Sequence, residues 1–203
     1  MATTRALEMD EARRMQETFG GRWALRNRCL VELGVRCGFR ISEMLSLRVA
    51  DVLEAPDEDG TCRVRDRLTV VRSNTKGKVA TRSVVLHPKA AEALALWVAD
   101  LQGQGYWRGE TWLFQSAWGA DRNTRITRVQ AWRIVREAAR RIHSRGCVGT
   151  HSMRKAAVTR FYEQCGRDLL RTQKFSGHKD LDSLRAYIAV DQEEVDGIVL
   201  SMD

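Results

Sequence analysis

The stretch CRVRDRLTVVRSNTKGKVATRSVVLHP, residues 62–88, decides the fold class of this 203-residue chain. β-Branched and polar residues alternate on either side of NTKGK (74–78), which contains a glycine. Alternation of this kind around a short glycine-containing turn is typical of a β-hairpin. A further short segment, TWLF (111–114), is a candidate for a third strand. We therefore predict a mainly α protein with a small antiparallel β-sheet, an α+β fold.

Helical periodicity dominates the sequence outside the hairpin, because apolar residues recur there at i, i+3 and i+4. Before the hairpin, this spacing predicts a helix over 7–19, a second one that is broken at Gly38, and a short third one that begins near Arg40. After the hairpin, it predicts helices over 90–101, 127–142, 152–165, 168–175 and 182–199. The helix over 127–142 is strongly basic, and its arginines alternate with Trp132 and Val135. We expect one face of this helix on the core and the other on phosphate.

Composition and charge narrow the function classes. Hydrophobic residues make up 43% of the chain and charged residues 30%, as in ordinary globular proteins. The formal net charge of +8 favours a polyanionic partner such as nucleic acid, although many basic proteins bind none. The net charge therefore indicates a class of binding partner, but it does not indicate which reaction the protein catalyses.

Targeting and redox features favour the cytoplasm. The five cysteines are scattered and form no CxxC pair, which disfavours a zinc site or a disulfide framework and favours a reducing compartment. The N-terminal MATTRALEMDEARRM has no apolar signal region. No apolar run approaches the length of a membrane span, about 20 residues. We expect a cytoplasmic protein with no membrane partner.

The segment GHKDLDSLRAYIAV (177–190) contains Tyr187, which has two interpretations. A tyrosine at helical spacing from Leu184 and Ile188 is most commonly a half-buried core residue. The alternative is a nucleophile that attacks a phosphodiester. Such a phenol, with a pKa of about 10, needs a base, the transition-state phosphate needs guanidinium donors, and the leaving oxygen needs an acid such as lysine. Two arginines, one or two histidines, a lysine and a tyrosine would suffice without a metal ion.

Each of these groups is present, although each has a simpler explanation when taken alone. Arg40 opens the short third helix, where free backbone N–H groups favour an anion, yet a single arginine is most often a solvated surface residue. His151 and Arg154 share one face of a helix start at i, i+3, and a surface pair is again the commoner arrangement. Lys76 lies in the hairpin turn, where lysines are usually solvated. His178 lies in a loop, where a capping role is common.

The spacing between His178 and Tyr187 requires a break in the last helical region. Nine residues of one continuous helix would separate them by about 13 Å and place them on opposite faces. The sequence KDLDS (179–183) supplies a break, because Asp182 or Ser183 is a good N-cap for a helix that carries Tyr187. A loop histidine and a helical tyrosine could then meet.

Four segments resemble, in this order, the signature boxes of the tyrosine recombinases, a family that includes phage integrases, Xer proteins and Cre. They are GFRISEMLSLRVADV, NTKGKVATRSVVLHP, THSMRKAAVTRFYE and FSGHKDLDSLRAYI. The resemblance runs from about residue 7 to the C-terminus, and four boxes in order with matching gaps are a specific signal. It implies the tyrosine recombinase catalytic-domain fold, with Tyr187 as the nucleophile that cleaves DNA.

The resemblance also implies a role for each candidate residue. Arg40 and Arg154 match the two arginines that clamp the scissile phosphate. His151 matches the base that takes the tyrosine proton, and His178 matches a histidine that donates to the phosphate.

Further roles come from the hairpin and from the first box. Lys76 matches the lysine that protonates the leaving 5′ oxygen, with Lys78 as the alternative if the turn is built differently. Glu43 matches an acidic residue that supports the active-site arginine and histidine. The candidate DNA contacts are Lys78, Arg125, Arg128, Lys155 and Lys179.

The chain departs from the family pattern at Cys37, Phe39, Met153 and Phe175, all apolar positions that we expect to be packing residues. Most family members carry an N-terminal helical domain, whereas the catalytic pattern here begins almost at Met1. We expect residues 1–203 to be a single catalytic domain with the N-terminal core-binding domain absent. Such a chain is either an excised domain or a minimal recombinase that resembles the fimbrial phase-variation invertases.

The implied function is a site-specific DNA recombinase of integrase or invertase type, acting through a 3′-phosphotyrosyl intermediate. It needs no cofactor, metal or ATP, because the ester keeps the bond energy. One alternative is relaxation of supercoils in the manner of a type IB topoisomerase. Another is a non-catalytic DNA-binding regulator, against which the intact set of six catalytic residues argues.

The expected partner is double-stranded DNA, bound by a homotetramer on paired sites that is a monomer in solution. The apolar stripe in VDQEEVDGIVLSMD (190–203) is a candidate for docking on a neighbouring subunit. Folding back of this segment on its own domain is an equal alternative.

Overall fold

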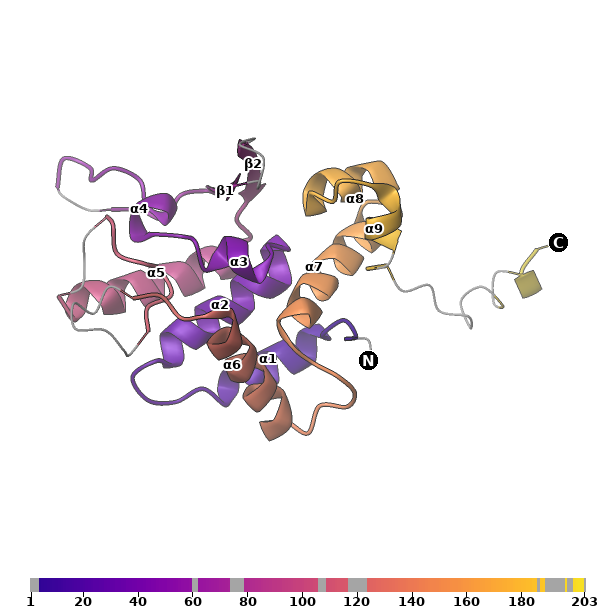
Figure 1. The fold of residues 1–203 in the computed structure, drawn as a ribbon, viewed down its shortest axis with the longest axis horizontal. Helices are drawn as coiled ribbons and strands as arrows, with labels where there is room; N and C mark the ends of the chain where they lie inside the picture. The colour runs from indigo at the N-terminus through magenta and orange to yellow at the C-terminus, as the bar shows by residue number, and fades with distance from the viewer. Residues whose placement is uncertain are drawn as a thin grey trace. The chain divides into compact units, whose positions relative to one another are not determined.

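The computed structural model describes residues 4–59, 62–73, 79–105, 109–116, 124–185, 187–188, 196 and 199–202. The chain divides into two compact units, Met1–Ala157 and Val158–Asp203, and each unit is taken by itself below. Figure 1 follows the chain from α1 to α9. Within the described ranges, no helix is long and apolar enough to cross a membrane.

Helices make up most of the first unit. They are α1 (Met9–Glu17), α2 (Ala24–Cys37), α3 (Ile41–Met44), α4 (Val49–Val52), α5 (Pro88–Gly103), α6 (Arg128–Arg141) and the beginning of α7 (Thr150–Gln164). α2 packs against α1, α3 and α5. It ends at Gly38, whose φ of 60° is a left-handed conformation that glycine adopts without strain. This turn brings Arg40 to the start of α3 only three residues after α2 ends.

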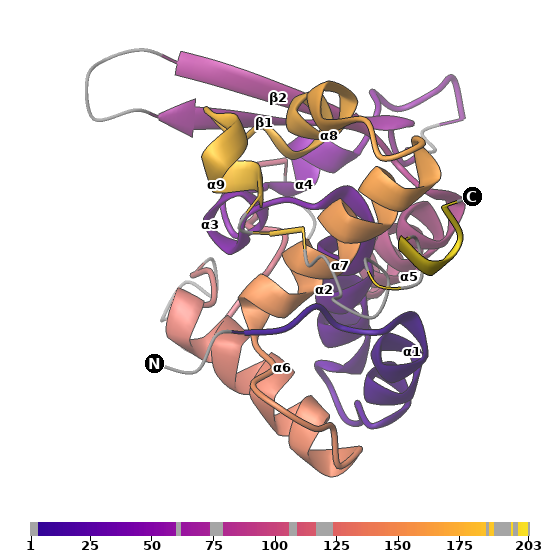
Figure 2. The same cartoon turned by 90° about the vertical axis from the view of Figure 1, so that its right-hand side faces the viewer.

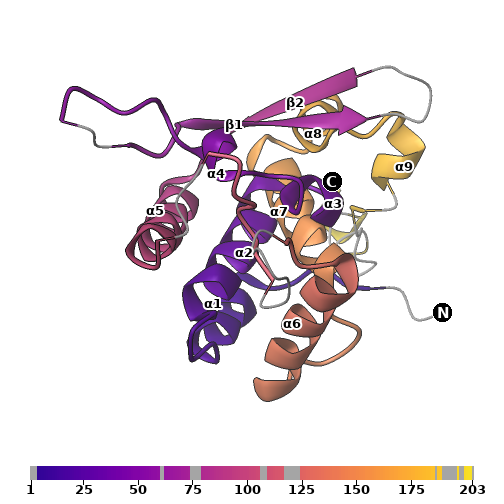
Figure 3. The same cartoon turned by 60° about the vertical axis from the view of Figure 1, so that its left-hand side comes forward.

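The predicted hairpin is confirmed. β1 (Arg67–Ser73) and β2 (Val79–Val85) are antiparallel, with Val70 opposite Arg82. Leu68, Val70 and Val84 are buried on one face, whereas Thr69 Oγ1 donates to Ser83 Oγ on the exposed face. The hairpin lies beside α3 and α4 and away from α1 and α6 (Figures 2 and 3). It therefore borders the turn that carries Arg40.

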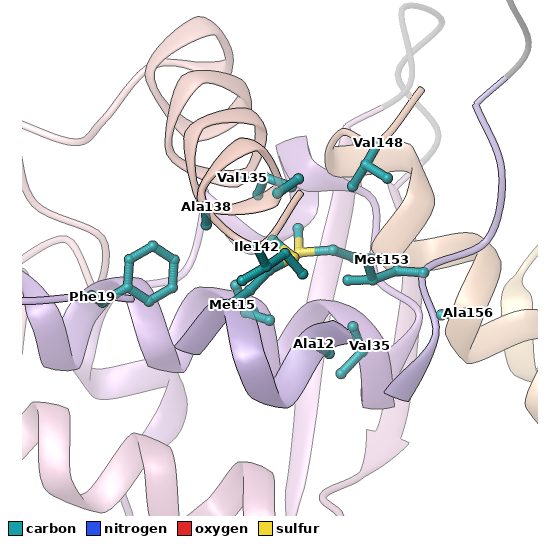
Figure 4. Close-up of a cluster of buried hydrophobic side chains, with 13 residues drawn as sticks. Ala12, Met15, Phe19, Val35, Val135, Ala138, Ile142, Val148, Met153 and Ala156 are labelled. Atoms are coloured by element: carbon teal, nitrogen blue, oxygen red, sulfur yellow. The ribbon is translucent and has the colours of Figure 1, made fainter. Parts of the chain in front are cut away.

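A cluster of buried apolar side chains joins α1, α2, α6 and the beginning of α7 (Figure 4). Met15 and Val135 are fully buried, and Met153 is 1% exposed. Burying a side chain of this size contributes about 1.5–3 kcal/mol. Because Met153 is anchored in this cluster, its neighbours His151 and Arg154 have a defined direction on α7. The cluster thus positions two of the predicted site residues.

The second unit contains α7 from Val158 onward, α8 (Leu169–Ser176) and α9 (Leu181–Arg185). The rings of Phe161 and Phe175 stack with centroids 4.2 Å apart. The Asp168 side chain caps α8 by accepting from the Arg171 N–H at 2.9 Å. Gly177, with a φ of 64°, ends α8 and starts the loop that carries His178.

The four departures from the family pattern are packing residues, as predicted. Cys37, Phe39 and Met153 are each 1% exposed, and Phe175 stacks on its aromatic neighbour. Burial raises the pKa of the Cys37 thiol to about 12, so this cysteine is an apolar packing group at neutral pH.

Two predictions in the first unit are wrong. Residues 111–116 add no strand to the described part of the sheet, because they form only isolated bridges to Arg48 and Arg125. Of the two residues expected on the core face of α6, Val135 is buried, but Trp132 is 47% exposed. Val135 shares the buried face of α6 with Ala131, Ala138 and Ala139. Small residues let α6 approach α1 closely, and the larger Trp132 is left outside this contact.

The last predicted helix is also corrected. α9 ends at Arg185, and Tyr187 lies in the turn that follows. The break after His178 is confirmed, but its cap is Asp180 and not Asp182 or Ser183. The Asp180 carboxylate accepts from the Ser183 N–H at 2.7 Å, and this bond lowers the pKa of Asp180. The cap prediction failed because α9 begins at Leu181, before both of the residues that we expected to cap it.

Candidate active site

Arg40 is held at the start of α3 by Glu43. The Arg40 N–H donates to Glu43 Oε2 at 2.8 Å, and Arg40 Nη1 donates to Oε1 at 3.1 Å. The Glu43 side chain is 5% exposed and that of Arg40 is 30% exposed. The buried carboxylate therefore fixes the orientation of a guanidinium group that still reaches solvent. The sequence predicts that Glu43 supports an active-site arginine, and these two contacts agree with that prediction.

Arg154 reaches the same turn from α7. It is 2% exposed, and its Nη1 donates to the carbonyl oxygen of Gly38, two residues before Arg40. The two arginines predicted to clamp a phosphate therefore converge on one turn, although they are far apart in the sequence. Convergent guanidinium groups are suited to a phosphate, because their planar donors match its oxygens.

His151 and Lys155 flank Arg154 on α7. His151 is exposed in the first turn of the helix, and Lys155 is half-buried. The helical spacing places His151 one turn before Arg154, as the sequence predicts.

Sequence reasoning missed Arg82, on β2. This arginine is 7% exposed, and its Nη1 and Nη2 donate to the carbonyl oxygens of Gly38 and Cys37, each at 3.0 Å. Its Nη1 also lies 3.7 Å from Glu43 Oε2. The strand alternation contained the signal, because Arg82 shares its face with Val84 and an arginine on an apolar strand face needs buried partners.

The pKa of Arg82 is lowered to about 10, chiefly by burial and then by the nearby charge of Arg154, while Glu43 acts in the opposite direction. Arg82 is still charged at neutral pH. The turn around Gly38 is therefore surrounded by three guanidinium groups, those of Arg40, Arg82 and Arg154, with one buried carboxylate among them. This is a locally electropositive environment.

In the second unit, His178 is oriented by Ser176. The Ser176 Oγ lies 2.7 Å from His178 Nδ1, and both residues are buried. A hydrogen bond to one ring nitrogen fixes the ring and directs the other nitrogen elsewhere. His178 is thus a preoriented imidazole in a loop.

Tyr187 lies beside His178 in this unit. The two ring centroids are 4.7 Å apart, with the planes inclined at 51°. The Tyr187 backbone is held by its N–H, which donates to the Leu184 carbonyl at 2.8 Å, and by its carbonyl, which accepts from Thr159 Oγ1 at 3.3 Å. Tyr187 is half-buried, so its ring is packed and still accessible.

The guanidinium groups of Arg48 and Arg125, both in the first unit, stack on the indole ring of Trp112. The guanidinium of Arg48 lies 3.8 Å from the Trp112 ring centroid, and that of Arg125 lies 4.8 Å from it. Arg125 Nη1 also donates to the Leu45 carbonyl at 3.3 Å, at the end of α3. Two cations on one indole form a rigid electropositive surface. Arg125 was a predicted DNA contact, whereas Arg48 and Trp112 were not singled out.

The remaining predicted residues fall into two groups. Arg128 and Lys179 are exposed, as a contact to DNA requires. Lys76 and Lys78 lie outside the described residues, so their roles stay predictions. In the part of the chain that the structure describes, no three histidine, cysteine or carboxylate side chains are grouped so as to hold a metal ion.

Sequence comparison relates the chain to known recombinases. The sequence model of the phage integrase family matches residues 5–194. The probable integrase/recombinase YoeC of Bacillus subtilis (strain 168) is 28% identical over 162 residues, which are 79% of this chain and 75% of YoeC. The tyrosine recombinase XerD of Mycobacterium leprae (strain TN) is 29% identical over 193 residues, 92% of this chain and 57% of XerD.

Structural comparison gives the same fold. The XerH site-specific recombinase, in a post-cleavage complex with palindromic difH substrate, matches with a TM-score of 0.71 and 19% identity over 98% of this chain and 53% of that one. The catalytic domain of bacteriophage HP1 integrase matches with a TM-score of 0.57 and 16% identity over 97% of this chain and 94% of that one. The chain thus spans little more than half of XerD and XerH and nearly all of the HP1 catalytic domain. The predicted recombinase catalytic-domain fold is confirmed.

Proposed function

Because this chain belongs to the phage integrase family, we propose that it is a site-specific recombinase that cuts and rejoins double-stranded DNA through a 3′-phosphotyrosyl intermediate. The observation that carries the proposal is the convergence of Arg40 and Arg154 on the turn at Gly38. This arrangement supports a phosphate clamp. The DNA bound by the XerH structure supports the choice of polyanion. Since chromosomal DNA would be the substrate, we infer that the protein acts in the cytoplasm.

In the proposed first step, Tyr187 Oη attacks the scissile phosphorus. A bond forms between Tyr187 Oη and phosphorus while the bond from phosphorus to the 5′ oxygen breaks. His151 takes the phenol proton, and Lys76, or Lys78, gives a proton to the departing 5′ oxygen. Arg40 and Arg154 neutralise the charge that gathers on the non-bridging oxygens.

The second step reverses the first with a different strand end. A 5′-hydroxyl attacks the phosphotyrosyl ester and gives its proton to Lys76, or Lys78, while the phosphorus–oxygen bond to Tyr187 breaks and the phenol oxygen takes a proton back from His151. His178 would donate to a non-bridging oxygen in both steps. Each step forms one phosphorus–oxygen bond and breaks one. Because the phosphotyrosyl ester conserves the energy of the phosphodiester, the proposed reaction needs no ATP, metal or cofactor.

The test is covalent capture on a suicide substrate that carries a nick near the cleavage position. We expect wild-type protein to become attached to the 3′ phosphate and Tyr187→Phe to bind this DNA without attachment, since only the hydroxyl is lost. Tyr162→Phe, at a half-buried position near the end of α7, serves as the matched control and should be captured like wild type. Capture of Tyr187→Phe, or loss of capture in Tyr162→Phe, would contradict the assignment.

A second assay separates recombination from relaxation. Recombination exchanges strands between two sites, whereas a topoisomerase relaxes supercoils on a single DNA molecule. We expect exchange between paired sites on a plasmid. Relaxation without any exchange would favour the topoisomerase alternative, and binding without capture would favour a regulator.

We also infer an assembly that forms on DNA. The protein would be a monomer in solution and a homotetramer on two paired sites, with residues 190–203 docking on a neighbouring subunit. Deletion of 191–203 should impair exchange far more than binding to one half-site, as measured by gel shift and plasmid recombination. Unchanged exchange by the truncated protein would show that this segment does not couple subunits.

A further inference from the structure

Arg82 is a buried charged residue to which the proposed mechanism gives no role. It lies on β2, opposite Val70 of β1, and is 7% exposed. A guanidinium in such a place loses most of its hydration, and ion pairs of this kind are often no more stabilising than an apolar side chain of similar volume. The contacts of Arg82 therefore need an explanation other than stability.

The first set of contacts holds the end of α2. Arg82 donates to the carbonyl oxygens of Cys37 and Gly38, each at 3.0 Å. The final carbonyls of a helix lack partners within the helix, so two of them are satisfied here by one planar group. The Arg82 guanidinium also lies 5.0 Å from the Phe39 ring centroid. Arg82 thus contacts the three consecutive residues that precede Arg40.

The second contact joins Arg82 to the partner of Arg40. Arg82 Nη1 lies 3.7 Å from Glu43 Oε2, and the same oxygen accepts from the Arg40 N–H at 2.8 Å. The other oxygen, Oε1, accepts from Arg40 Nη1 at 3.1 Å. Glu43 therefore lies between the two arginines, and its position depends on both.

The third contact is shared with Arg154. The Gly38 carbonyl oxygen accepts from Arg82 Nη1 and also from Arg154 Nη1. One carbonyl and one carboxylate thus connect Arg82 to both arginines of the proposed clamp. If Arg82 were lost, the Gly38 carbonyl would lose a buried donor, Glu43 would lose a buried cationic neighbour, and the two guanidinium groups would lose their common support.

We propose that Arg82 is a positioning residue that sets the placement of Arg40 relative to Arg154, so that both guanidinium groups are oriented for the scissile phosphate before DNA binds. This inference rests on the function proposed above. Donors that are oriented in advance stabilise a transition state without reorganisation. Arg82 is 7% exposed and contacts the Gly38 turn and Glu43, so it would act through these neighbours.

The experiment compares Arg82→Met and Arg82→Lys with wild type in single-turnover covalent capture. One suicide substrate carries a natural scissile phosphate, and a second carries a methylphosphonate there, which lacks the charge that the clamp neutralises. On the natural substrate we expect Arg82→Met to slow capture by about 10- to 100-fold, comparable to or less than loss of a direct oxyanion donor. On the methylphosphonate substrate the loss should be at least several-fold smaller. Arg82→Lys, which keeps the charge but not the planar fork, should fall between wild type and Arg82→Met.

The controls distinguish positioning from folding. Arg67→Met removes an exposed arginine from β1 of the same hairpin and should capture both substrates like wild type. If Arg82→Met fails to fold by circular dichroism, the comparison of the two substrates is made with Arg82→Lys. An equal loss on both substrates, or no loss on the natural one, would overturn the positioning role. Failure of wild-type protein to capture either substrate would instead overturn the proposed function and, with it, this inference.

Discussion

The imidazole ring of His178 packs against the phenol ring of Tyr187, with ring centroids 4.7 Å apart. The two residues are nine positions apart, and a continuous helix would hold them on opposite faces. They meet because α8 ends at Gly177, α9 starts at Leu181, and Tyr187 follows in a turn after α9. The second unit thus brings a preoriented histidine to the tyrosine.

We expect loss of the Ser176 hydroxyl to slow DNA cleavage, because this group lies 2.7 Å from His178 Nδ1 and orients the ring. A neutral hydrogen bond contributes about 1 kcal/mol, which predicts a loss of about 5- to 10-fold in single-turnover capture by Ser176→Ala. Ser183→Ala, at an exposed position of α9, serves as the control. An unchanged rate in Ser176→Ala would show that the ring needs no such support.

The turn lysine is predicted to act as the general acid. Lys76→Ala should slow cleavage of a normal substrate, and a 5′-bridging phosphorothiolate should restore the rate because sulfur leaves without a proton. The measurement is the capture rate on the two substrates. Rescue of Lys78→Ala and not of Lys76→Ala would transfer the role to Lys78.

The stack of Arg48, Trp112 and Arg125 should contribute to DNA binding through charge. Arg125→Ala should weaken binding to all sequences alike and reduce the slope of log K against log salt by about 1, as expected for one lost phosphate contact. Trp112→Leu keeps both charges but removes the ring that orients them, so a smaller loss is expected. Binding is measured by fluorescence anisotropy at several salt concentrations. Arg13→Ala, at an exposed position of α1, should leave the slope unchanged, and an equal effect of both alanine variants would argue against a specific contact.

Gly34 is predicted to be required for packing between α2 and α7. A Cβ built at Gly34 would lie 2.8 Å from Met153 Sδ and 2.9 Å from Met153 Cβ. Alanine in a helix gains about 1 kcal/mol over glycine, but overpacking typically costs about 1–3 kcal/mol. We expect Gly34→Ala to lower the free energy of unfolding in urea. Gly103→Ala, where no atom lies within 4 Å of the added Cβ, should leave it unchanged or raise it. Stabilisation by both substitutions would show that Met153 moves aside freely.

Glu11 should make stability depend on acid pH. Hydrogen bonding from Arg5 lowers the pKa of Glu11 from 4.5 to about 2, and Ser144 contributes in the same direction while burial opposes it. A carboxyl group whose pKa is lowered by folding stabilises the folded state at every pH above its pKa in the unfolded chain. For Glu11 this stabilisation is lost as the pH falls from about 4.5 towards about 2. At pH 7 we expect Glu11→Gln to lower the free energy of unfolding by about 1–2 kcal/mol. This is less than the pKa shift alone would give, because Arg5 is partly exposed and solvent screens the pair.

The measurement is urea unfolding of wild type and Glu11→Gln across this pH range. The difference between them should shrink as the Glu11 carboxylate of wild type is protonated. Glu17→Gln, at an exposed position of the same helix, should change stability little. A difference that stays constant down to pH 2 would contradict the assigned role of the ion pair.

Several elements were predictable from local signals. The helices α1, α2, α5 and α7 follow the apolar spacing, and the hairpin follows strand alternation. Start signals were less reliable, because Asp180 and not Asp182 or Ser183 caps α9. The third strand failed for a different reason. Leu113 donates its N–H to the Leu47 carbonyl, and Phe114 and Ser116 bond to residues 124–126, so this segment pairs with other parts of the chain and not with the hairpin.

The sequence by itself determined the order of most elements, the buried face of the hairpin and the identity of the family, because these depend on periodicity and on four ordered motifs. Only the tertiary structure decided that Arg82 and Arg154 share the Gly38 carbonyl. These contacts join residues 44 and 116 positions apart. Periodicity specifies which face of a strand or helix is buried, but the partner of a buried polar group depends on which distant backbone atoms the packing leaves without a hydrogen bond.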